Sequence, residues 1–162
     1  MEILTKYHII HSYLGLTHII FAIFALLFGT VVLLNPKGSE KHRRIGYAYV
    51  ISMILMNATA MGIYNFGKAN VFHFFIILSL FTLTMGIYPA LKRTQNWLSR
   101  HYYFMSWSVV GLYCAFWAEM GVRLFDMRAF WWVVMVATMV TSAIGGVVIH
   151  KLGKKIKAVN SY

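Results

Sequence analysis

The chain has 162 residues, of which 60% are hydrophobic and only 12% are charged, so a water-soluble domain is excluded because its surface would need far more charge. The formal net charge of +11 could indicate nucleic-acid binding, but the positions of the charges indicate membrane topology instead, and no nucleic-acid partner is expected. Cys114 is the only cysteine, which excludes an internal disulfide and a cysteine metal cluster.

Long apolar stretches predict transmembrane helices. Five stretches, almost free of Lys and Arg, are each long enough, at about 20 residues, to cross about 30 Å of hydrocarbon. They lie near residues 12–34, 46–66, 71–91, 102–124 and 129–150. The first is too long for the core of a signal peptide and no small-residue cleavage site follows it, so we expect it to be retained. The sequence therefore predicts an all-α polytopic membrane protein with one transmembrane domain over residues 1–162.

The basic residues are unevenly divided between the two sides of the membrane that five spans define. Eleven Lys and Arg residues fall in the loops around 35–45 and 92–100 and in the tail, 151–162, whereas only four fall on the other side. By the positive-inside rule, this asymmetry places the N-terminus outside and the C-terminus in the cytoplasm. The basic tail can also contact anionic lipid.

Four histidines mark the ends of the first four predicted spans. His18 and His73 lie toward the outer side, whereas His42 and His101 lie toward the cytoplasmic side. The His–His spacings of 24 and 28 residues make the chain read as two similar hairpins. This layout predicts a four-helix bundle of two hairpin repeats with one histidine pair toward each face and a fifth helix outside it. Small residues in "TSAIGG" of the fifth stretch predict close packing against the fourth helix or another copy of the chain.

The fourth stretch also carries an intramembrane carboxylate. Glu119 follows His101 by 18 residues, which is five helical turns or about 27 Å, so both are expected on one inward face with Met105. Arg123 lies one turn beyond Glu119, and an i,i+4 ion pair that only orders the helix end is an equal alternative to a ligand role. Asn57 in the second stretch adds a polar amide near the middle of the membrane, where polar groups usually face the bundle interior.

Two motifs resemble a known family. The stretches "HRRIGYAYV" and "RHYYFMSWSVVGLY", the latter followed by "AEMGVR", resemble the DUF2306 family of bacterial membrane proteins, over about residues 15–125. The resemblance implies a helical protein of the bacterial inner membrane and implies no reaction. The arrangement of one histidine per helix is more loosely similar to cytochrome b561-type di-haem bundles.

Three function classes are open, and so is the question of whether the protein is an enzyme. The first is an electron carrier in which His18 with His73, and His42 with His101, bind haem b, with a redox protein or quinone as partner. The second is an outer Zn or Fe site of His18, His73 and Glu119 with hydrolytic or redox activity. The third is a non-catalytic subunit or small transporter that uses Asn57, Glu119 and Arg123 for packing or a proton path. A homo-oligomer through the fifth helix is possible in each class.

Overall fold

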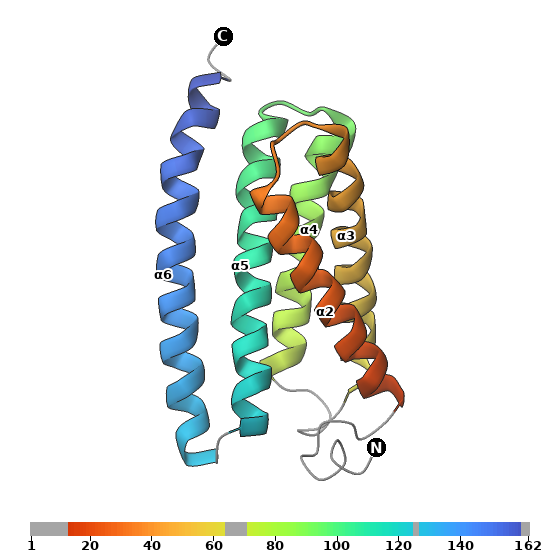
Figure 1. The fold of residues 1–162 in the computed structure, drawn as a ribbon, viewed down its shortest axis with the longest axis vertical. Coiled ribbons are helices and arrows are strands. Elements are labelled where there is room, and N and C mark those ends of the chain that lie inside the picture. Colours follow the sequence, from red (N-terminus) through yellow and green to blue (C-terminus); the bar gives the residue numbers. More distant parts are fainter. Residues whose placement is uncertain (1–12, 64–70, 125–126, 160–162) are drawn as a thin grey trace. The chain divides into compact units, whose positions relative to one another are not determined.

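The computed structural model describes residues 13–63, 71–124 and 127–159, with side chains except at 71–72, 122–130 and 155–159. This part of the chain forms five α-helices (Figure 1). They are α2 (Tyr13–Leu34), α3 (Glu40–Met61), α4 (Val71–Lys92), α5 (Trp97–Leu124) and α6 (Met127–Val159). The chain divides within α4 into two compact units, Met1–Leu80 and Phe81–Tyr162.

In the first unit, α2 and α3 form a helical hairpin with a short connection (Figure 1). Ser39 caps α3, and its Oγ accepts a hydrogen bond from the backbone N–H of His42 at 3.1 Å. The Lys37 ammonium donates to the carbonyls of Val32 and Leu33 at 3.0 and 2.6 Å, which satisfies carbonyls at the end of α2. Burial lowers the pKa of Lys37. The cap at the start of α3 and the hydrogen-bonded carbonyls at the end of α2 therefore fix the position of the connection between the two helices.

In the second unit, α6 packs closely along α5 through its small residues. A Cβ built on Gly145 would lie only 2.5 Å from Cγ2 of Val110, so only glycine lets the two backbones approach this closely. The hydroxyl of Tyr102 donates to the carbonyl of Ile149 at 3.0 Å, and the Cys114 thiol lies 3.7 Å from the hydroxyl of Ser142. Of the two expected packing partners of these small residues, the fourth predicted helix or another copy of the chain, the structure shows the fourth helix, α5.

The helix bounds confirm some sequence expectations and correct others. A helix forms at each of the five predicted stretches, and α2 and α4 match their expected bounds within about one residue. The stretch expected at 46–66 overlaps a helix that begins earlier, at Glu40, where Ser39 supplies the cap, and that ends at Met61. The segment expected as a tail from 151 is helical up to Val159.

Three helices in the described part of the chain are long and apolar enough to cross a membrane. These candidate spans are Tyr13–Leu34, His73–Lys92 and Trp131–Lys154. The other two helices, α3 and α5, have 22 and 28 residues and are also long enough, but they carry more polar side chains.

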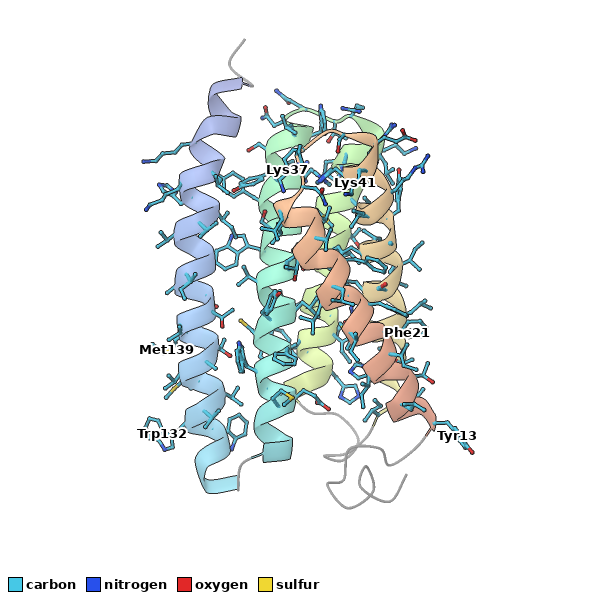
Figure 2. The ribbon with its side chains drawn as sticks, viewed as in Figure 1. Tyr13, Phe21, Lys37, Lys41, Trp132 and Met139 are labelled. Carbon is cyan, nitrogen blue, oxygen red and sulfur yellow. The ribbon has the colours of Figure 1, made fainter. Side chains whose placement is uncertain are left out.

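The outward face of α6 is apolar. Trp132 and Met139 point away from α5 (Figure 2), and their side chains are 67% and 64% exposed. An exposed apolar helix face of this kind is expected in contact with lipid.

Candidate functional site

His18 of α2 is anchored to α3 within the first unit. Its Nδ1 lies 3.1 Å from the carbonyl oxygen of Met56 and 3.2 Å from Oγ1 of Thr59. The ring is half-buried. Both partners lie on α3, so this contact links the N-terminal part of α2 to the C-terminal part of α3.

The hydrogen bonds around His18 determine its tautomer. The Thr59 hydroxyl has one hydrogen, which it donates to the carbonyl of Leu55 or Met56, at 3.0 or 2.8 Å, so toward His18 it is an acceptor. The Met56 carbonyl can only accept. The proton of the neutral His18 ring must therefore be on Nδ1, and Nε2 carries the lone pair. A histidine in this state offers Nε2 as a ligand to a metal.

His101 of α5 has the same arrangement in the second unit. Its Nδ1 lies 3.0 Å from the carbonyl oxygen of Gly86 in α4, and a carbonyl can only accept. The neutral His101 ring therefore also carries its proton on Nδ1 and its lone pair on Nε2. Gly86 allows the approach, because a Cβ there would lie 2.7 Å from Sδ of Met105 and 3.1 Å from its backbone nitrogen.

His42 and His73 both belong to the first unit and are half-buried. His42 is the third residue of α3, whereas His18 contacts Thr59, 17 residues later. At a rise of 1.5 Å per residue, His42 and the residue that His18 contacts, Thr59, are about 25 Å apart along α3. His73 lies in the first turn of α4, about 60° around the axis from buried Ile76.

Asn57 joins α3 to α4 in the first unit. Its amide nitrogen donates to the carbonyl of Met53 at 2.7 Å and lies 3.1 Å from the hydroxyl of Ser79, and only 3% of the residue is exposed. This bond fixes the register between the part of α3 that contacts His18 and the half of α4 that begins near His73. Asn57 is therefore a packing residue that positions the histidine-bearing helices.

The remaining predicted site residues are Met105, Glu119 and Arg123. Met105 packs against Gly86 beside His101. Glu119 is exposed on α5 in the second unit, whereas His18 and His73 belong to the first. The side chain of Arg123 lies outside the described residues, as do His8 and His11. His150 is exposed on α6.

Among the residues whose side chains are described, no three His, Cys, Asp or Glu side chains form a group that could hold a metal ion. The site of His18, His73 and Glu119 therefore stays a prediction from the sequence.

Sequence reasoning did not identify the partners of the histidine rings. Thr59 and the carbonyl of Met56 hold His18, and the carbonyl of Gly86 holds His101. A glycine inside an apolar helix is a signal of close backbone approach, and Gly86 carries that signal. Thr59 carries no comparable signal, because threonine is common in membrane helices.

Comparison with known proteins gives a family match. The sequence model of a family described as a predicted membrane protein, DUF2306, matches residues 15–152. No curated protein and no solved structure matches the chain.

Proposed function

The chain belongs to the DUF2306 family of predicted membrane proteins, and we propose that it binds haem b through its membrane histidines and carries electrons across the bilayer. The observation that supports this most is the anchoring of His18 and His101. Each ring directs Nδ1–H to a backbone carbonyl on a neighbouring helix, at 3.1 and 3.0 Å, which leaves the lone pair of the neutral ring on Nε2.

This arrangement is the one that metal-binding histidines usually have. A ligating imidazole commonly donates its second N–H to a carbonyl or carboxylate, which fixes the ring orientation and raises the basicity of the ligating nitrogen. Two imidazoles from facing helices are a common axial ligand set for haem in helical bundles. A bound haem would supply one-electron redox chemistry, and the histidines would hold and orient it.

The positions of the histidines favour one site toward each face of the membrane. We pair His18 with His73 toward the outer face and His42 with His101 toward the cytoplasmic face. Within the first unit, the separation of about 25 Å along α3 between His42 and the residue that holds His18 is close to the thickness of the hydrocarbon layer, about 30 Å. Two sites at these depths would divide the membrane into short electron-transfer steps.

The same proposal includes topology and partners. All five helices span the bacterial inner membrane, with the N-terminus outside and the C-terminus in the cytoplasm, because eleven of the fifteen Lys and Arg residues lie on one side. The electron donor or acceptor is a quinone or a redox protein. A second copy of the chain would meet the outward face of α6, which exposes Trp132 and Met139.

Single histidine substitutions test the ligand assignment. We expect His18→Ala or His73→Ala to remove one set of low-spin b-type bands, and His42→Ala or His101→Ala to remove the other. His150→Ala is the matched control, because His150 is exposed on α6 and should leave both sets unchanged.

Elemental analysis separates haem from a bound metal ion. Two imidazoles complete a haem without a carboxylate, so Glu119→Ala should leave the spectrum unchanged. About one Zn or Fe per chain, lost on Glu119→Ala as well as on His18→Ala, would overturn the haem proposal in favour of the outer metal site. A colourless preparation without stoichiometric metal would overturn both and favour a subunit or transporter.

A further inference from the structure

We propose that the basic end of the second unit, formed by the end of α4, the start of α5 and the end of α6, is a binding surface for the headgroups of anionic lipids. Its described cationic residues are Lys92, Arg93, Arg100, Lys151 and Lys154, and all five are exposed. We call this surface the basic rim.

Contacts within the second unit bring these three segments to one end. The hydrogen bond between His101 Nδ1 and the Gly86 carbonyl, 3.0 Å long, joins the start of α5 to the last two turns of α4. The hydrogen bond from the Tyr102 hydroxyl to the Ile149 carbonyl, also 3.0 Å long, joins the start of α5 to α6. Gly153 lies against Tyr102 and Tyr103 one turn later. The basic residues of all three helix ends therefore lie at the same end of this unit, within about 10 Å of one another along the helix axes.

Among the described side chains of the second unit, no carboxylate lies at the level of the basic rim. From Phe81 to Tyr162 the chain has only two acidic residues, Glu119 and Asp126. Glu119 follows Arg100 by 19 residues of helix, about 28 Å along α5, and Asp126 comes after the end of that helix. We infer that the counter-charges come from outside this unit, and in a membrane protein the phosphates of the adjacent leaflet can supply them.

The length of α6 places its basic end at the headgroup layer. The helix has 33 residues, about 50 Å, whereas the hydrocarbon layer is about 30 Å thick. Its candidate membrane span, Trp131–Lys154, ends at the rim lysines. The helix continues to Val159, so its last turns extend beyond the hydrocarbon.

Aromatic residues at the same end are typical of the membrane interface. The Arg93 guanidinium lies 3.9 Å from the centre of the Trp97 ring. Tyr102 and Tyr103 stack edge to face with ring centres 5.2 Å apart. Aromatic rings are enriched at headgroup depth, which agrees with the level assigned to the basic rim.

Native mass spectrometry with defined lipids tests this proposal. The probe is phosphatidylglycerol in competition with phosphatidylcholine of the same acyl chains, added to the purified full-length protein. We expect the wild-type protein to retain phosphatidylglycerol selectively. Each charge removed should weaken the selectivity about fivefold, so Lys151→Gln with Lys154→Gln should weaken it about 25-fold.

Two controls make the result specific. Arg128→Gln changes a charge at the other end of α6 and should leave the selectivity unchanged, whereas Lys151→Arg with Lys154→Arg keeps the charge and should keep the selectivity. Equal retention of both lipids by the wild-type protein would overturn the proposal, as would equal losses in the Arg128→Gln control and the double Gln variant. Haem content is measured on the same samples, and its presence or absence leaves this outcome unaffected.

Discussion

The contact of Gly145 with Val110 gives a prediction whose size follows from the structure. A Cβ at position 145 would lie 2.5 Å from Cγ2 and 3.2 Å from Cγ1 of Val110. Optimal carbon–carbon contacts are about 3.5–4.0 Å, so Gly145→Ala must move α6 away from α5 by about 1 Å. Val110 cannot easily turn aside, because it is buried and β-branched.

The adjacent glycine is a matched control. At Gly146 a Cβ would lie 3.6 Å from the Trp107 ring, an ordinary contact. Gly146→Ala should therefore gain up to about 1 kcal/mol from helix propensity. Gly145→Ala has the same gain, but overpacking costs about 1–3 kcal/mol. The two variants should differ by about 1–3 kcal/mol, with Gly145→Ala the less stable.

Two measurements follow this difference. Unfolding in SDS, followed by circular dichroism, gives the free energy of unfolding of both variants. The labelling rate of Cys114 with a maleimide reports on the helix pair itself, because this half-buried thiol lies 3.7 Å from the hydroxyl of Ser142. Labelling should be faster in Gly145→Ala, and Val110→Ala should reverse the effect. Equal stability and equal labelling of the two glycine variants would refute the close packing of α6 on α5.

Three further predictions concern the first unit. Ser39→Ala should lower the free energy of unfolding by about 1 kcal/mol, measured in SDS, because it removes the cap of α3, and Ser39→Asp should restore it. Asn57→Leu should lower the free energy of unfolding by about 0.6 kcal/mol, and a double-mutant cycle with Ser79→Ala should show coupling between the two residues. Strictly additive changes in the free energy of unfolding would contradict the hydrogen bond between Asn57 and Ser79. Thr59→Val should weaken haem retention about tenfold, because it removes one hydrogen-bond acceptor from His18 Nδ1. Thr59→Ser keeps the hydroxyl and should keep haem retention. Equal haem retention in the two variants would show that the Thr59 hydroxyl has no role in holding His18.

The ends of the helices show what apolar runs do and do not specify. The apolar runs define the lipid-crossing parts of α2 and α4 well, because these helices begin and end where the apolar residues do. The same rule places the start of α3 too late. The basic residues before residue 46 do not lie within an apolar span, but they form regular helix behind the Ser39 cap. Charged residues limit the part of a helix that can enter lipid, but they do not limit the length of the helix itself.

The candidate site could be predicted only in part for a related reason. The periodicity of a helix tells which residues share a face, and Met105 and His101, four residues apart on α5, both meet Gly86 of α4. It does not tell which atom of a neighbouring helix meets a given side chain. The hydrogen bonds of His18 to Met56 and Thr59 depend on the rotation and depth of α2 against α3, which are set by packing across the whole hairpin.

The most direct test of haem binding is the reduced-minus-oxidised visible spectrum of the purified wild-type protein, with haem quantified against the protein chain. The anchoring of His18 and His101 through Nδ1 predicts sharp low-spin b-type bands and about two haems per chain. A featureless difference spectrum from protein purified after expression with an adequate haem supply would contradict the claim that these histidines bind haem.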